Sequence, residues 1–119
     1  MKRWYLIKPD GTVEERPAKF HQIMASDDAD AQLKLLQSSV GGWVEHVQLD
    51  KHTELWCNEE GKLRNLPYNP RATLIWVAFF GQTDTICGPV LVSLDEPVNR
   101  VVESILGPHI DPVIEFLYG

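Results

Sequence analysis

Apolar and polar side chains alternate along residues 3–7, and this pattern predicts a strand with one buried face. The sequence KPDG at positions 8–11 has proline second and glycine fourth, which indicates a tight turn. Residues 12–15 can therefore return beside the first strand as a hairpin, and Pro17 ends the pairing because proline has no backbone N–H. Residues 20–25 are ambiguous and also fit a short strand.

Helical spacing begins after two residues that cap helices well, Ser26 and Asp27. Over residues 28–40 the apolar positions recur at intervals of four, three and four, which places them on one face of a helix. These positions are Ala29, Leu33, Leu36 and Val40. Gly41 suits the residue that follows a helix, and Gly42 gives the chain freedom to turn into a strand.

Two strands are predicted next, over residues 43–49 and 53–58, followed by a turn in which Gly61 supplies a positive φ. Alternation places Glu45 on the same face as the apolar residues of its strand. If that face is the core, the carboxylate must be hydrogen-bonded, paired or protonated, as a general base or a ligand anchor would be. The alternative is that Glu45 reaches the solvent margin of the sheet and has no chemical role.

Trp56 shares a strand face with Glu54 and Asn58, and these polar neighbours predict that the face looks outward. An exposed tryptophan beside polar groups suits a protein partner or a stacking ligand. The alternative is that Trp56 covers a second packed layer. The turn that follows carries two carboxylates, Glu59 and Glu60, and the amine of Lys62, which could do acid–base work. The alternative is a solvated hairpin turn chosen for its geometry.

Residues 72–80 are almost wholly apolar, so periodicity does not separate a helix from a buried strand there. Asn69-Pro70 before this run and Gly81 after it favour the helix, because asparagine caps helices and proline begins them. A helix that is apolar on every side must be buried on most of them. We therefore expect residues 70–80 to form the central helix of the domain.

The chain ends with a predicted strand over residues 84–94 and two predicted helices. Asp95 caps the first of these helices, with Pro97 in its first turn, and the last helix runs over residues 113–118. This last helix can complete the core or pack on a second copy of the chain, which would give a homodimer. The elements together predict an α+β fold class, with a single domain over residues 1–119 in which a mixed, mainly antiparallel sheet packs against helices.

Composition argues against several classes of function. Acidic residues number 17 against 11 basic ones, and the net charge of -6 disfavours general binding of nucleic acid. No apolar run is long enough for a signal peptide or a membrane span, so we expect no membrane association and a cytoplasmic location. Cys57 and Cys87 lack a CxxC spacing, which predicts two free thiols in a reducing compartment. The histidines show no metal-ligand spacing and no cofactor motif occurs, so we expect no metal and no cofactor.

Four short motifs occur in order over residues 36–94. They are VGGxxE at positions 40–45, NEEGKL at 58–63, LPxN at 66–69 and DxIxG at 84–88. In this order they resemble domain-of-unknown-function family 3846, a family of small proteins found largely in phages, plasmids and bacteria. The family has no established activity. The resemblance therefore implies a phage or mobile-element accessory protein and a set of positions, without a mechanism.

Nine residues are the candidate ligand- or partner-binding positions: Gly41, Gly42, Glu45, Trp56, Asn58, Glu60, Lys62, Asn69 and Asp84. The first hypothesis is a non-enzymatic protein-interaction module that binds an unidentified host or phage protein in the host cytoplasm. The alternative is a protein that binds or sequesters a small ligand, such as a nucleotide signal, in a pocket near Gly41, Glu45, Asn58 and Asn69. No catalytic constellation is recognised, so an enzyme is the third hypothesis and no catalytic residue is assigned.

Overall fold

The computed structural model describes residues 2–107 of the chain. Its elements, in chain order, are β1 Arg3–Ile7, β2 Val13–Glu15, α1 Ala18–Met24, α2 Ala29–Val40, β3 Val44–Asp50, β4 Thr53–Asn58, α3 Pro70–Phe80, β5 Val90–Leu94 and α4 Arg100–Leu106. The strands form one sheet in the order β2-β1-β5-β4-β3. The α+β fold class is confirmed, and over the described residues the sheet is wholly antiparallel rather than mixed.

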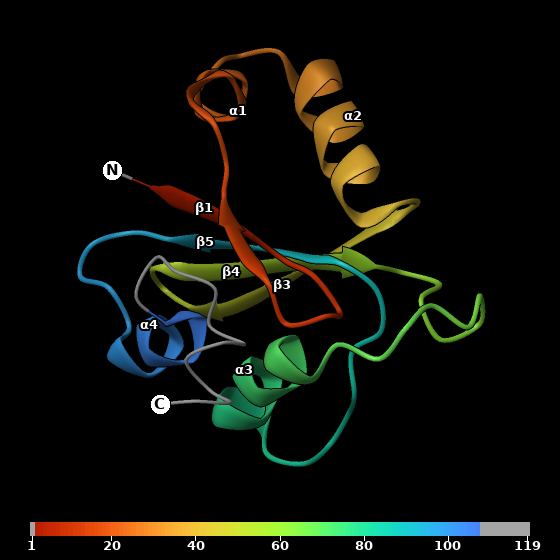
Figure 1. Ribbon diagram of the computed structural model, residues 1–119. Coiled ribbons are helices and arrows are strands. Elements are labelled where there is room, and N and C mark those ends of the chain that lie inside the picture. Colours follow the sequence, from red (N-terminus) through yellow and green to blue (C-terminus); the bar gives the residue numbers. More distant parts are fainter. Residues whose placement is uncertain (1, 108–119) are drawn as a thin grey trace.

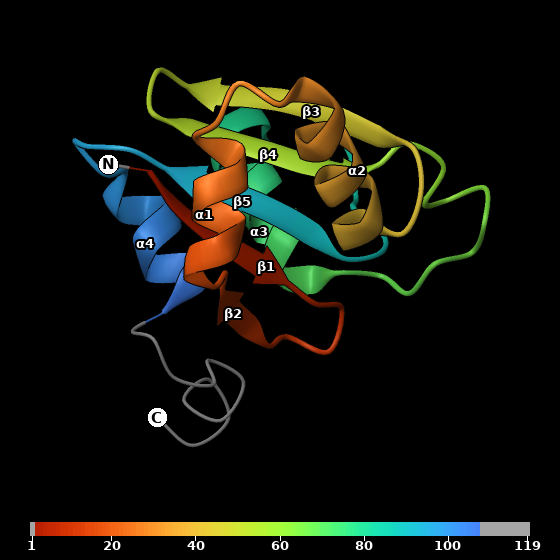
Figure 2. The same cartoon turned by 90° about the horizontal axis from the view of Figure 1, so that it is seen from above.

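Helices cover both faces of the sheet, so the domain has three layers. The α1 and α2 helices lie on one face, and the α3 and α4 helices lie on the other (Figures 1 and 2). The central strand β5 has the sequence VLVSL, and all five of its residues are buried. A strand with apolar side chains on both faces suits this position, because each face meets a layer of helices.

Each face of the sheet has its own hydrophobic cluster. The cluster under α3 and α4 includes the fully buried side chains of Ile7, Leu55, Ile75, Val90, Val92 and Val102. The cluster under α1 and α2 is richer in aromatic side chains and consists of Trp4, Leu6, Phe20, Leu36, Trp56 and Leu91. The alternation of side chains along β4 therefore sends consecutive residues into different clusters.

Trp56 is buried, with 8% of its surface exposed, and its ring centroid lies 4.9 Å from that of Trp4. The prediction of an outward-facing tryptophan is therefore wrong, and the alternative of a second packed layer is correct. The polar neighbours of Trp56, Glu54 and Asn58, suggested an exposed face, but each has a polar partner of its own on this face of the sheet. Glu54 pairs with Lys2 at 3.0 Å, and Asn58 donates to the last carbonyl of α2.

The two helices with strong cap signals lie where the sequence predicts them. The N-cap of α2 is Asp28, one residue beyond the predicted caps, and its side chain accepts a hydrogen bond from Ala31 N at 3.0 Å. Gly41 ends this helix with a φ of 81°. The α3 helix begins at Pro70 with Asn69 as its cap, which settles the choice between a helix and a buried strand.

The structure resolves one ambiguous segment and contradicts one prediction about a helix. Most of residues 20–25 belong to α1 rather than to a strand; Pro17 precedes this helix without a side-chain cap and Phe20 is its one buried residue, so periodicity is weak there. The α3 helix lies in an outer layer rather than at the centre of the domain (Figure 1). Leu74 and Phe80 are consequently 54% and 40% exposed.

The β5 strand is shorter than the strand predicted over residues 84–94 and begins at Val90. Gly88 precedes it with a φ of 89°, and its N–H bonds to Pro67 O at 2.7 Å. An isolated antiparallel bridge joins Cys87 to Tyr68. The segment before β5 therefore runs beside the connection between β4 and α3 instead of extending the sheet.

The α4 helix is capped by Asn99, whose side chain accepts hydrogen bonds from two backbone N–H groups at its start. The prediction that Asp95 caps this helix is therefore wrong. The helix predicted over residues 113–118, and a homodimer formed through it, lie outside the described residues. Within residues 2–107, no helix is long and apolar enough to cross a membrane.

Candidate functional site

Asn58 ends β4 and is 6% exposed. Its Nδ2 donates to Val40 O at 3.1 Å, and its Oδ1 accepts from Glu60 N at 2.8 Å. A Cβ at Gly42 would lie 2.9 Å from Asn58 Nδ2, so a glycine allows the chain to pass this amide. Asn58 and Gly42 therefore join the end of α2 to the turn after β4, which gives both candidates a structural role.

Gly61 does not supply a positive φ, and that prediction is wrong. A Cβ at this position would lie 2.6 Å from Cys87 O, a distance that real Cβ contacts essentially never reach. The glycine is needed because two backbone segments approach each other closely there. The positive φ of this connection belongs to Asn65, at 54°.

Asn69 is fully buried and its side chain makes three hydrogen bonds. Its Oδ1 accepts from Ala72 N at 3.0 Å, while its Nδ2 donates to Ile7 O at 3.1 Å and to Gly88 O at 2.9 Å. This one amide connects the start of α3, the end of β1 and the segment before β5. A ligand pocket that uses Asn58 and Asn69 stays a prediction, but the amide groups of both residues are already engaged by the protein.

Glu45 is exposed, although it lies on the face of β3 that alternation predicts. The β3 strand is at the edge of the sheet, so the carboxylate reaches solvent there. Its Oε1 lies 3.7 Å from Cys57 Sγ, which donates to it. Burial and, next, the negative charge of Glu45 raise the pKa of the Cys57 thiol to about 12. Cys57 is therefore a protonated thiol at neutral pH and lacks the thiolate that nucleophilic catalysis requires.

Lys62 and Asp84 form an ion pair between the turn after β4 and the segment before β5, with 54% and 46% of their side chains exposed. The hydrogen bond from Lys62 lowers the pKa of Asp84. The charges of both residues act on Cys57, so this pair and Glu45 lie in one neighbourhood.

The connection between β4 and α3, residues 59–68, projects beyond the end of the sheet and is called the 59–68 loop (Figure 2). Its backbone is ordered by hydrogen bonds from Arg64 N to Glu60 O at 2.9 Å and from Leu66 N to Gly61 O at 2.9 Å. At its tip, Leu63 is 84% exposed. The loop therefore holds a large apolar side chain in solvent on a fixed backbone.

Two further exposed aromatic residues flank the 59–68 loop. Trp43 is 64% exposed and its carbonyl accepts from Glu59 N at 2.8 Å, while Tyr68 is 52% exposed at the far end of the loop. Sequence reasoning missed Leu63, Trp43 and Tyr68 as site residues. The isolated leucine in the polar run NEEGKLRN was not a signal by itself, because single exposed apolar residues are common on protein surfaces.

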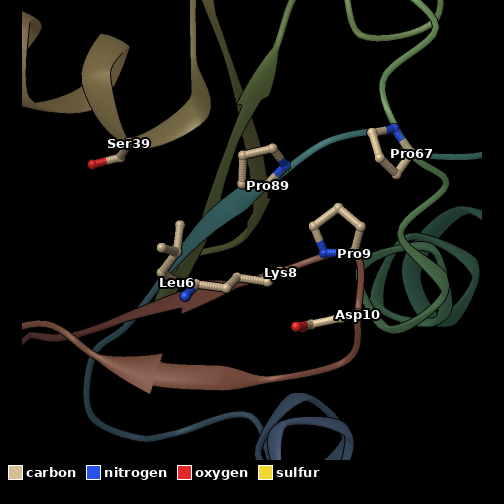
Figure 3. Close-up of a pocket in the computed structure, with 7 residues that line it drawn as sticks. All are labelled: Leu6, Lys8, Pro9, Asp10, Ser39, Pro67 and Pro89. Carbon is tan, nitrogen blue, oxygen red and sulfur yellow. The ribbon is translucent and has the colours of Figure 1, made fainter.

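A pocket of about 680 Å³ lies beside the base of the 59–68 loop, at Pro67 (Figure 3). It is lined by Leu6, Lys8, Pro9, Asp10, Ser39, Pro67 and Pro89. These residues come from β1, the turn after it, α2, the 59–68 loop and the segment before β5. None of the nine predicted site residues lines it. The segments that form the pocket lie far apart in sequence, so no local motif could have revealed it.

Metal and thiol chemistry can be examined directly. Over residues 2–107, no group of three or more histidine, cysteine, aspartate or glutamate side chains is arranged to hold a metal ion. Cys57 and Cys87 are both free thiols, as the sequence predicts.

The protein is thus a three-layer α+β domain in which the buried candidates Asn58 and Asn69 serve the fold, while Leu63 of the 59–68 loop is exposed. The chain belongs to the family described as Domain of unknown function (DUF3846), whose model matches residues 1–110. The match extends well beyond residues 36–94, where the motifs are found. No curated protein and no solved structure matches the chain.

Proposed function

We propose that this protein is a non-enzymatic interaction module that binds a protein partner through the 59–68 loop. The observation that carries the proposal is the 84% exposure of Leu63 on a hydrogen-bonded loop, with exposed Trp43 and Tyr68 on either side. The proposed partner is a host or phage protein, and the proposed place of action is the host cytoplasm.

The residue types at the 59–68 loop support a partner surface. Trp, Tyr and Arg dominate the binding energy of protein interfaces, and Trp43, Tyr68 and Arg64 supply one of each. The Arg64 guanidinium reaches Gly42, the residue before Trp43, since its Nη1 would be 3.3 Å from a Cβ at Gly42. Exposed apolar side chains that gather in one place mark interaction sites more often than scattered ones do.

The order of the 59–68 loop also favours binding. A loop that is already fixed loses little conformational entropy when a partner covers it. Asn58 and Asn69, both buried, hold the two ends of this loop through their side-chain amides. The loop is therefore presented on a rigid base rather than folded by the partner.

The non-enzymatic part of the proposal rests on the groups that would have to react. Cys57 is held as a neutral thiol, with its pKa raised to about 12 by burial and by Glu45. The amides of Asn58 and Asn69 bond to backbone groups of the protein itself. These candidates therefore supply neither an activated nucleophile nor a free pair of polar groups for a substrate.

The test is affinity capture from the natural host with the wild-type chain and the Leu63→Ser variant, quantified by mass spectrometry. A partner should be enriched by the wild type and lost with Leu63→Ser. Burying one leucine contributes about 1.5–3 kcal/mol, so the purified partner should bind the variant at least about tenfold more weakly.

Leu74→Ser is the matched control, because Leu74 is also an exposed leucine, at 54%, but belongs to α3 rather than to the loop. This variant should capture the partner as the wild type does. Equal capture by Leu63→Ser and the wild type would contradict the proposal, as would a partner lost from both variants alike.

A further inference from the structure

The pocket beside the base of the 59–68 loop has the size of a small-molecule site. Its volume of about 680 Å³ lies within the range of roughly 300–1,000 Å³ that small-ligand pockets occupy. Pro67 of the 59–68 loop lines it, but the exposed residues that carry the proposed partner surface, Leu63, Trp43 and Tyr68, do not. A small molecule in the pocket would therefore bind at a different place from the proposed protein partner.

The pocket walls are mainly apolar and rigid. Pro9, Pro67 and Pro89 lie near one another, and Leu6 lies to one side of them (Figure 3). Leu6 is 8% exposed. Proline side chains lose no rotamer entropy when a ligand covers them, so this surface is suited to an apolar body about the size of a ring.

The charged groups of the pocket favour a cation. Both hydrogen bonds from Thr12 to Asp10, at 3.0 Å and 2.7 Å, go to Oδ1, which leaves Oδ2 for a ligand. The bonds from Thr12 lower the pKa of Asp10, which therefore stays ionised. Lys8 also lines the pocket and its charge acts on Asp10, but its ammonium group is paired with Glu14 Oε2 at 2.9 Å.

We propose that this pocket binds a small molecule with an apolar, ring-sized body and an ammonium group, which Asp10 receives at the pocket edge. Asp10 is exposed at the edge of the pocket, where its carboxylate lies near the side chain of Lys8 in the view of Figure 3. The net charge of -6 adds a general attraction for cations. Apolar walls then hold the body of the ligand, and the carboxylate sets its charge preference.

The probes are phenethylamine and phenylacetate, which carry the same ring and opposite charges. Each is titrated into the ¹⁵N-labelled full-length protein while amide chemical shifts are recorded. Phenethylamine should shift the amides of Lys8, Asp10 and Ser39 at millimolar concentration, and phenylacetate should shift them less. Equal or stronger binding of phenylacetate would overturn the proposal, as would the absence of shifts at these residues.

Two pairs of variants locate the site. Asp10→Asn should weaken phenethylamine binding by about three- to fivefold, since an exposed ion pair contributes up to about 1 kcal/mol. Asp27→Asn removes the same charge from an exposed position elsewhere and should leave binding unchanged. Ser39→Phe narrows the pocket and should weaken binding by about tenfold.

Ser38→Phe is the control for the last variant, because Ser38 is the exposed neighbour of Ser39 and also donates to Leu35 O. If Asp10→Asn and Ser39→Phe bind phenethylamine as well as their controls do, the pocket is not its site and the proposal fails. The Leu63→Ser variant should bind phenethylamine normally. Failure of the pocket and failure of the partner surface are thus separate results.

Discussion

Polarity and burial are reversed between the ends of the 59–68 loop and its tip. Asn58 and Asn69 lie at the ends, are polar and are buried, with every side-chain amide group bonded to backbone. Leu63 lies at the tip, is apolar and is 84% exposed. The difference teaches that polarity alone is a poor guide to function here. The buried amides of Asn58 and Asn69 fix the backbone at both ends of the loop, whereas the exposed apolar side chain of Leu63 is free to contact a partner.

The largest expected effect is at Asn69. In Asn69→Ala, the α3 helix loses its cap and the buried carbonyls of Ile7 and Gly88 lose a donor. A lost cap costs about 1 kcal/mol and unsatisfied buried groups cost about 1–3 kcal/mol. Urea denaturation should therefore show a loss of about 3 kcal/mol in the free energy of unfolding.

Asn99→Ala is the matched control for this prediction, because Asn99 also caps a helix but is only partly buried. It should cost about 1–2 kcal/mol, because it removes the cap and one partly buried hydrogen bond from Asn99 Nδ2 to Asp50 Oδ2. Leu63→Ser, by contrast, should change stability by less than about 0.5 kcal/mol. If Asn69→Ala cost no more than Asn99→Ala, Asn69 would be a simple cap and the contrast between ends and tip would weaken.

A second, smaller effect concerns Cys57, which lies between the buried frame and the exposed Glu45. Its pKa rises from 9.0 to about 12 on folding, so folding favours the protonated thiol. The resulting stability is fully present below pH 9 and is lost as the pH rises through the folded pKa. At about pH 10.5 the wild type should have lost roughly 2 kcal/mol through this group, relative to pH 8.

The measurement is the free energy of unfolding at both pH values for the wild type, Cys57→Ala and Cys87→Ala. Other groups titrate in the same range, so the quantity of interest is the difference between proteins. Cys57→Ala should lose about 2 kcal/mol less than the wild type on the pH change, and Cys87→Ala should keep the loss. Identical losses in all three proteins would show that the Cys57 thiol is not the group responsible.

The same contrast explains what the sequence predicts well. The α2 and α3 helices carry local signals, a capping side chain before them and a glycine after them, and both lie where those signals place them. Strand alternation also placed Glu45 on the correct face. These features depend on neighbours in sequence, so no knowledge of the tertiary structure is needed.

Features that depend on distant segments could not be predicted. Trp56 is buried only because α1 and α2 cover its face of the sheet, and the seven-residue α1 itself has one buried residue and no side-chain cap. Gly61 is needed because Cys87 O approaches it from another part of the chain. The pocket around Pro9 and Pro89 likewise exists only after five segments meet. Candidate sites made by local motifs were visible in the sequence, and sites made by packing were not.

The smallest expected effect concerns Lys62. It tests whether this residue contributes little to stability, like Leu63 at the tip, or much, like Asn69 at an end of the loop. Its ion pair with Asp84 is about half exposed, so Lys62→Ala should lower the free energy of unfolding by no more than about 0.5 kcal/mol, and less in high salt. Because Lys62 lowers the pKa of Asp84, the contribution is present above the unfolded pKa of the carboxyl group and is lost as the pH falls through the folded value. Urea denaturation at neutral and at acid pH should show the two proteins converging in acid. A loss near 2 kcal/mol at neutral pH would instead make Lys62 an anchor like Asn69, and the exposed tip would then shrink to Leu63 and its aromatic neighbours.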